Sequence, residues 1–179
     1  MTAPAANGLV LGFHPSNQGF GWIAFSGPFS IHHWGVSDMG REKNEGCLRK
    51  LERLLERLNP HTIVLEAYEG TKPARSERIV RLCRAVVAMA KDRGIEVAIY
   101  ARNEIVTCFI SIGAKTRYEI ASAIARSFEI LRDRLPAPRK QWETVHRRMT
   151  LFDAAALVLT HYNLGASQLF DDLLHGRPK

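Results

Sequence analysis

Three polar residues stand in or beside apolar segments of the sequence and could do chemistry. Glu66 lies near the end of the run "TIVLEAY", Asp153 lies in "TLFDAAAL", and His14 directly follows "GLVLGF". A carboxylate in a buried strand is costly unless a cation or hydrogen-bond donors compensate its charge. A divalent metal ion is one such compensation, because hard cations bind carboxylate oxygens. An arginine partner or exposure to solvent is the alternative for Glu66.

Asp153 and His14 also have readings that need no ligand. Thr150 precedes Asp153 by three residues, which is the spacing of an N-cap threonine and an acidic N3 residue favoured by the helix dipole. His14 would then be a polar residue that ends a strand before the turn "PSNQG". From the residues alone, both interpretations of each position stay open.

Hydrophobic periodicity predicts five strands and four helices. The strands are expected at 8–13, 19–25, 29–36, 62–68 and 95–101, and the helices within 45–60, 76–94, 115–135 and 150–162. The first three strands follow one another through short turns, which predicts an antiparallel meander. The later strands alternate with helices, which requires right-handed crossovers and parallel pairing. The predicted fold class is therefore α/β, with a mixed five-stranded sheet flanked by helices.

Composition limits the class of protein. A chain of 179 residues that is 46% hydrophobic can form one domain with a real core, expected to span 1–179. No run of about 18 apolar residues and no leader pattern occurs, so no membrane segment is expected and a cytoplasmic location is predicted. Three widely spaced cysteines without a CxxC pair argue against disulfides and against a thiolate zinc site. The net charge of +7 suggests a polyanionic partner, although it also fits ordinary solubilising charge.

The order of elements and four segments resemble the RuvC family of Holliday-junction resolvases, within the ribonuclease H-like superfamily. The segments are "GFHPSNQGFGWIAF", "IVLEAYEG", "SIGAKTRYEIASAI" and "DAAALVLTHY", and the resemblance covers roughly 8–164. It implies a ribonuclease H-like fold, a homodimer and branched or duplex DNA as the partner. It also implies an endonuclease that uses two divalent metal ions, Mg²⁺ or Mn²⁺, to hydrolyse a phosphodiester.

The resemblance assigns catalytic and metal-binding roles residue by residue. Glu66 and Asp153 match two metal ligands of the family, whereas His14 stands where the family has an aspartate and Thr150 where it has a further ligand. The residues that could substitute for the missing ligands are His146, Glu69 and Glu143. A neutral imidazole offers one lone pair and no charge, so a site that uses His14 is expected to favour Mn²⁺ over Mg²⁺.

The resemblance also suggests which residues contact DNA. Tyr68 lies close to the place of a base-stacking aromatic, although it could equally pack at the edge of the core, and Arg117 falls near the expected scissile phosphate. Val106 replaces a lysine of the family. Other candidate contacts are basic residues in the same loops and in the arginine-rich rows: Lys72, Arg75, Lys115, Arg147 and Arg148. Such rows are also typical of solvated helix faces.

Three functional hypotheses follow. The first, which we favour, is a metal-dependent RuvC-like endonuclease of branched DNA with an altered ligand set. The second is a nucleic-acid-binding protein that keeps the fold and has lost cleavage. The third interprets "HPSNQGFGW" as the phosphate-binding hairpin of an actin-like ATPase or sugar kinase. That fold needs two lobes, so the length of 179 residues argues against the third hypothesis.

Overall fold

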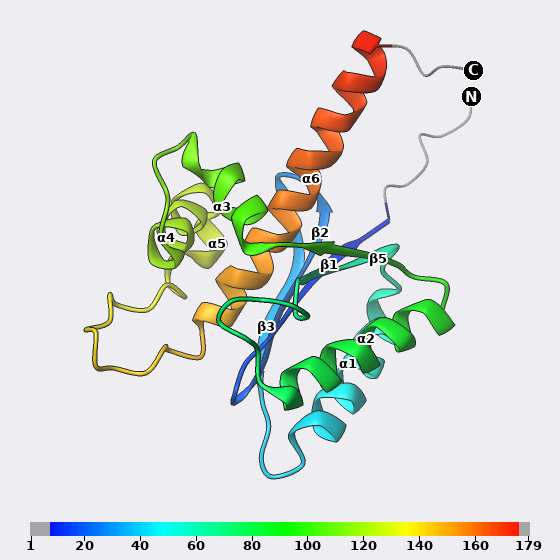
Figure 1. The fold of residues 1–179 in the computed structure, drawn as a ribbon, viewed down its shortest axis with the longest axis vertical. Coiled ribbons are helices and arrows are strands. Elements are labelled where there is room, and N and C mark those ends of the chain that lie inside the picture. Colours follow the sequence, from blue (N-terminus) through cyan, green and yellow to red (C-terminus); the bar gives the residue numbers. More distant parts are fainter. Residues whose placement is uncertain (1–7, 176–179) are drawn as a thin grey trace.

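A mixed five-stranded sheet forms the centre of the computed structural model, which describes residues 8–175 (Figure 1). Its strands are β1 (Val10–Pro15), β2 (Gly19–Gly27), β3 (Ser30–Asp38), β4 (Thr62–Glu66) and β5 (Glu96–Tyr100). Their order in the sheet is β3-β2-β1-β4-β5, with β1 to β3 antiparallel and β1, β4 and β5 parallel. The predicted fold class is confirmed.

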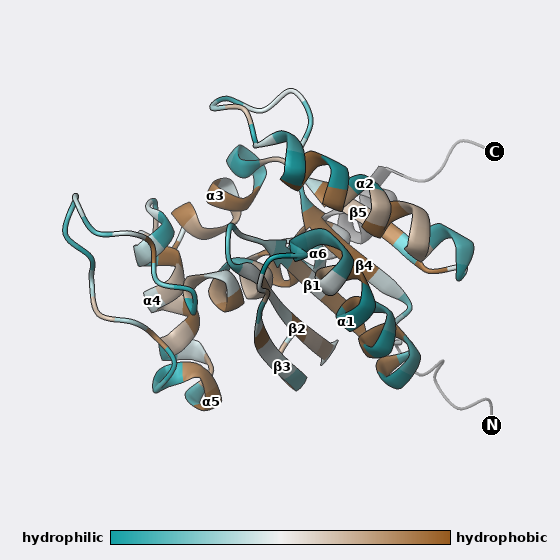
Figure 2. Cartoon of the chain, turned by 90° about the horizontal axis from the view of Figure 1, so that it is seen from below, coloured by the Kyte–Doolittle hydropathy of each residue, from teal (hydrophilic) through white to brown (hydrophobic). Residues whose placement is uncertain are grey.

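Two helices cover one face of the sheet (Figure 2). Helices α1 (Lys43–Leu58) and α2 (Glu77–Asp92) place leucine-rich stripes against this face. Alternate strand residues such as Leu11, Phe13 and Leu65 complete the apolar cluster beneath them. Cys47 and Cys83 lie buried in the same cluster, and all three cysteines are free, as predicted.

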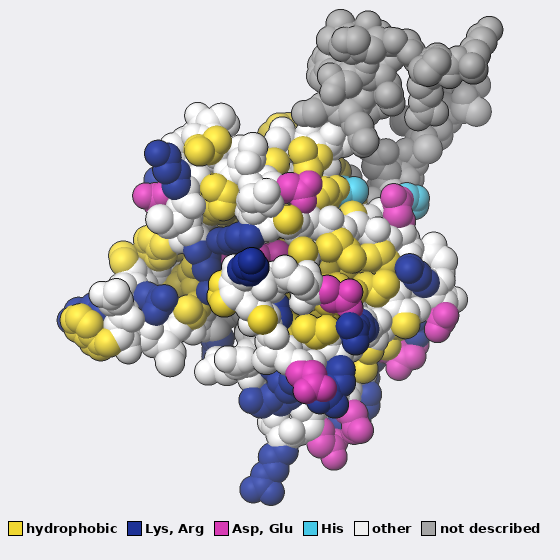
Figure 3. All heavy atoms as spheres, in the orientation of Figure 1, with side chains coloured by type: hydrophobic (Ala, Val, Ile, Leu, Met, Phe, Trp, Pro, Cys, Tyr) yellow, Lys and Arg dark blue, Asp and Glu magenta, His cyan; other side chains and the backbone are white. Residues whose placement is uncertain are grey.

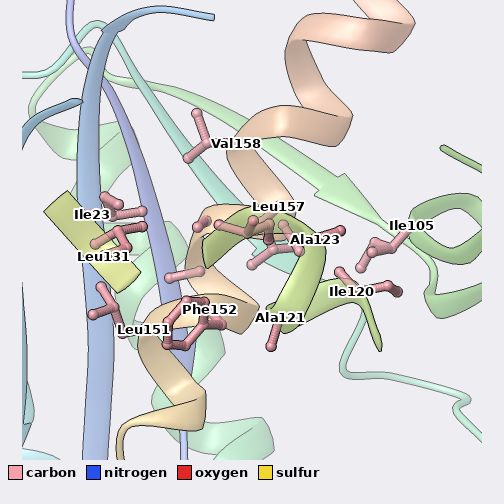
Figure 4. Packing of buried hydrophobic residues seen from close by; sticks show 14 of the residues in the cluster. Ile23, Ile105, Ile120, Ala121, Ala123, Leu131, Leu151, Phe152, Leu157 and Val158 are labelled. Carbon is pink, nitrogen blue, oxygen red and sulfur yellow. The ribbon is translucent and has the colours of Figure 1, made fainter. Parts of the chain in front are cut away.

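Helix α6 (Met149–His175) lies across the opposite face, together with α3 (Arg102–Ile110), α4 (Arg117–Ser127) and α5 (Glu129–Arg132). Figure 4 shows Phe152, Leu157 and Val158 of α6 packed among side chains of β2, α3, α4 and α5. The N-terminal part of α6 is buried nearly all round because it lies between the sheet and these helices. Within residues 8–175, no helix is long and apolar enough to cross a membrane.

Two glycines let α6 lie directly on the strand backbones. A Cβ at Gly12 would stand 2.3 Å from the carbonyl oxygen of Ala154, and one at Gly21 would stand 2.3 Å from the carbonyl carbon of Thr150. Both distances are far below van der Waals contact, so any larger residue would push the helix away. The start of α6 is therefore held closer to β1 and β2 than side chains would allow.

The helices of the structure differ from the prediction at α3 and within 115–135. Helix α3 was not predicted, because its apolar residues form only a short stripe in which Ile105 and Phe109 are buried. The single helix expected over 115–135 is divided at Phe128, whose backbone is extended between α4 and α5. The ring of Phe128 packs edge-on against that of Phe25, with centroids 5.6 Å apart. This contact in the core outweighs the local tendency to continue the helix.

The capping interpretation of Thr150 and Asp153, one of the two left open by the sequence, does not match the structure. Helix α6 begins at Met149, so Thr150 lies inside the first turn and donates a hydrogen bond from Oγ1 to the carbonyl oxygen of Arg147 at 2.7 Å. Asp153 lies beyond the first turn, which contains no acidic residue. The helix dipole therefore does not explain why Asp153 is buried.

The close approach of α6 gives a stability prediction. Gly12→Ala forces the new Cβ against the α6 backbone and is expected to lower the free energy of unfolding by about 1–3 kcal/mol. The matched control is Gly27→Ala, where the added Cβ meets nothing within 4 Å. Urea denaturation midpoints measure both effects. Equal midpoints for the two variants would contradict the packing account.

Candidate functional site

The pairing of β1 with β4 brings His14 and Glu66 together. Gly12 is the parallel partner of Val64, so the positions two residues further along each strand are also neighbours and point to the same face. His14 Nε2 lies 3.2 Å from Glu66 Oε2. Both residues stand at the carboxyl ends of their strands, on the face that α6 covers.

Helix α6 adds Asp153 to this pair. The nearest oxygen of Asp153 is 3.7 Å from His14 Nδ1, a buried nitrogen that makes no hydrogen bond. The side chains of His14 and Asp153 are only 8% and 5% exposed. The structure therefore brings His14, Glu66 and Asp153 together in one buried cluster. His14 and Asp153 are 139 residues apart in the sequence.

Two arginines neutralise the carboxylates of the cluster. Arg75 Nη2 lies 3.1 Å from Glu66 Oε2. Arg117 donates from Nε to Asp153 Oδ1 at 2.9 Å and also binds Oδ2 through Nη2, so this pair is bidentate. The arginine alternative left open for Glu66 is the arrangement that the structure shows. Charge compensation, rather than helix capping, explains the burial of Asp153.

The pKa values reflect this pairing. Burial acts to raise the pKa of Glu66, but the hydrogen bond and charge of His14, with the charges of Arg75 and Arg102, outweigh it and lower that pKa to about 2. Burial acts to lower the pKa of Arg117, whereas its hydrogen bond and charge interaction with Asp153 raise it. Both interactions hold the carboxylate–guanidinium pairs in their ionised forms.

Three helices begin around the cluster with arginines at or just before their first turn. Arg75 precedes the α2 N-cap Ser76, and Arg102 and Arg117 are the first residues of α3 and α4. A helix N-terminus carries a partial positive charge, so arginine there opposes the helix dipole and adds to the local positive potential. The arrangement attracts anions such as phosphate.

Two adjoining hollows open above the cluster, with volumes of about 530 and 600 Å³. Both are lined by His14, Arg75 and Arg117. One extends to Lys72 and Arg102, and the other to Arg147 and His146. Figure 3 shows Lys and Arg side chains gathered over the middle of this face, with Asp and Glu side chains between them. A basic groove thus leads to the buried carboxylates.

The residues present do not fit a two-cation centre in this arrangement. Across residues 8–175, no group of three or more His, Cys, Asp and Glu side chains is placed to hold a metal ion. Glu69 pairs with Arg84 at 2.5 Å, and the Glu143 carboxylate accepts the backbone N–H of Lys140. Neither replaces a missing ligand. Two divalent cations would face two carboxylates that guanidinium groups already neutralise.

The structure also places the remaining predicted DNA contacts. The half-buried Tyr68 packs against the apolar core under α1 and α2. The side chains of Lys72, Lys115 and Arg148 are exposed. Arg147 forms an ion pair with Asp38 at the end of β3. Arg102 was missed because nothing in the sequence marked 102–110 as a helix that starts at the site.

The Arg117–Asp153 pair gives a second stability prediction. Arg117→Ala leaves a buried carboxylate without its partner and is expected to cost about 2–4 kcal/mol of unfolding free energy. The double variant with Asp153→Asn should recover part of this loss. Arg81→Ala, which removes an exposed pair with Glu77, is expected to cost less than about 1 kcal/mol in the same urea titration. Equal losses in the two single variants would show that burial does not strengthen the Arg117 pair.

Comparisons with known proteins find similar sequences and folds. No family model matches the chain. The crossover junction endodeoxyribonuclease RuvC of Protochlamydia amoebophila (strain UWE25) is 24% identical over an alignment of 131 residues, and the match covers 66% of this chain and 76% of that protein. Thermus thermophilus RuvC, solved in complex with a Holliday-junction substrate, superposes with a TM-score of 0.65 and 17% identity over 90% of this chain and 96% of that one. The yeast mitochondrial Holliday junction resolvase Ydc2 superposes with a TM-score of 0.60 and 15% identity, over 97% of this chain and 87% of its own. The chain is thus similar in sequence to a RuvC protein and shares the fold of RuvC-type Holliday junction resolvases.

Proposed function

We propose that the chain binds branched DNA of the Holliday-junction type, with the phosphate backbone lying over the cluster of His14, Glu66 and Asp153. The observation that carries this proposal is the convergence of Arg75, Arg102 and Arg117, each at a helix start, around one basic groove. The likeness to RuvC proteins, one of them solved with a Holliday-junction substrate, supports the branched form of the DNA.

The carboxylates would orient the arginines for this task. A guanidinium group has five N–H donors, and the contacts of Arg117 with Asp153 use only those on Nε and Nη2. Nη1 keeps its donors for a phosphate oxygen. The side chains of Arg75 and Arg117 are 25% and 35% exposed, so their free ends reach the groove. Buried carboxylates that hold the guanidinium planes in place reduce the entropy lost on binding phosphate.

Metal-dependent cleavage, with the altered ligand set expected from the sequence, is the second candidate function. The observation that favours it is the convergence of His14, Glu66 and Asp153, with His14 Nδ1 buried and unpaired. Cleavage would require Mg²⁺ or Mn²⁺ to bind the two carboxylates in place of Arg75 and Arg117, which hold them in this arrangement. We place binding first because both carboxylates are engaged by arginines. A homodimer, inferred from the resemblance alone, would present two such centres to the two-fold symmetry of a junction.

DNA binding is tested by its salt dependence. The logarithm of the affinity for a four-way junction is expected to fall linearly with the logarithm of salt concentration. Arg102→Ala with Arg148→Ala is expected to reduce that slope by about one unit for each phosphate that the variant no longer neutralises. The matched control is Arg53→Ala on α1, at the opposite face of the sheet, which should leave the slope unchanged. Binding that is independent of salt, or absent at low salt, would contradict the proposal.

The two candidates differ in their response to metal. If binding is the function, the wild-type chain should bind the junction in EDTA and leave it intact with Mg²⁺ or Mn²⁺. His14→Asp adds a third carboxylate and is expected to raise Mg²⁺-supported cleavage above the wild-type level. Gel assays with both metals measure these outcomes. Wild-type cleavage that prefers Mn²⁺ and is abolished by Glu66→Gln or Asp153→Asn, with binding retained, would establish the second candidate instead.

A further inference from the structure

A tryptophan is exposed on the loop that joins α5 to α6. Residues 137–148 of this loop are all exposed, and Trp142 is 80% exposed. The other two tryptophans are less exposed: Trp22 is 6% exposed and Trp34 is partly buried. Leaving a large indole in water forgoes the favourable free energy of burial, so its exposure suggests a partner.

The turn that presents Trp142 is ordered by hydrogen bonds. The backbone N–H of Glu143 donates to the carbonyl oxygen of Lys140 at 3.0 Å, and the backbone N–H of Lys140 donates to the Glu143 carboxylate at 3.0 Å. Arg139 also donates to the carbonyl oxygen of Glu143 at 2.6 Å. Lys140 Nζ lies 5.5 Å from the centroid of the Trp142 ring. The turn therefore holds a largely exposed indole that has Lys140 over its ring and Arg139 nearby in the same turn.

The same loop borders the basic groove. Thr144, Val145, His146 and Arg147 line one hollow together with His14 and Arg117, so Trp142 stands two residues before the wall of the site. Tyr118 ties the other end of the loop to the body by donating from its hydroxyl to the carbonyl oxygen of Pro136 at 3.0 Å. The loop projects at the left of Figure 1, and in the same view Figure 3 shows hydrophobic atoms beside Lys and Arg atoms at that edge.

We propose that Trp142 stacks on an unpaired nucleobase of the DNA whose backbone lies in the basic groove. This inference rests on the proposed function and adds a residue that holds opened bases. An indole face stacks on any base, and Arg139 and Lys140 can contact the flanking phosphates. Tyr68, the aromatic residue expected in this role from the sequence, is half-buried against the core and offers less free surface. The excess of basic residues in the loop favours DNA over an apolar protein partner.

The test compares paired and unpaired DNA. Fluorescence anisotropy measures the affinity for a perfect duplex and for a four-way junction with unpaired 2-aminopurine bases at its branch point. Trp142→Ala is expected to weaken junction binding about tenfold and duplex binding less than about twofold, since only the junction offers a base for stacking. Trp142→Phe should retain most of the affinity. Phe29→Ala removes an aromatic that is 89% exposed at the opposite end of the sheet, and it should change neither affinity.

The spectra give a second measurement. Stacking on Trp142 is expected to quench the emission of 2-aminopurine at the branch point in the wild-type complex, and Trp142→Ala should remove that quenching. Equal losses for duplex and junction, or an unchanged junction affinity with quenching retained, would overturn the role of Trp142 while leaving DNA binding in place. No binding of either DNA by the wild-type chain would overturn the proposed function, and this inference with it.

Discussion

The site depends on the contact between the start of α6 and the bare backbones of β1 and β2. Gly12 and Gly21 allow the α6 backbone to come closer than any side chain would permit, and Asp153 is carried toward His14 by that approach. The strand register then supplies Glu66 from the neighbouring strand. The relative positions of His14, Glu66 and Asp153 therefore depend on backbone packing between α6 and the strands. The starts of α2, α3 and α4 above the site add the arginines.

The two buried carboxylates require positive charge or hydrogen-bond donors around them. An ionised carboxylate that is about nine-tenths buried needs cations or hydrogen-bond donors within a few ångströms, and this chain supplies them from Arg75, Arg117 and His14. With a histidine at the end of β1, the centre holds two carboxylates, and each of them pairs with an arginine. The cluster is therefore nearly neutral, and the groove around it is basic. This charge distribution is the physical reason for proposing DNA binding before hydrolysis.

The sheet could be predicted from the sequence, whereas the ion pairs of the site could not. Apolar runs predicted all five strands, because the continuous apolar runs of β1 and β4 depend only on local residue order. The short turns and the intervening helices predicted their mixed pairing. Helix α3 was missed because its buried stripe consists of little more than Ile105 and Phe109. The contact of Arg117 with Asp153 spans 36 residues, and no local pattern encodes such a partner. His14, Glu66 and Asp153 were singled out as polar residues in or beside apolar segments, and the resemblance to the RuvC family assigned their roles. Arg75 and Arg117 were expected to contact DNA, but their pairing with these carboxylates was not predicted.

Arginine at the first position of a helix is unfavourable for that helix, since its charge repels the positive end of the dipole. Nevertheless, Arg102 and Arg117 occupy the first positions of α3 and α4, and Arg75 lies beside the start of α2. The carboxylates offset this repulsion for Arg75 and Arg117. Among residues 8–175, Arg102 forms no ion pair, and its charge interacts only more weakly with Glu66. A phosphate in the groove would satisfy all three arginines and the helix ends together. Of these three arginines, Arg102 is the one whose repulsion no carboxylate contact offsets, and the phosphate proposed above would offset it at the start of α3.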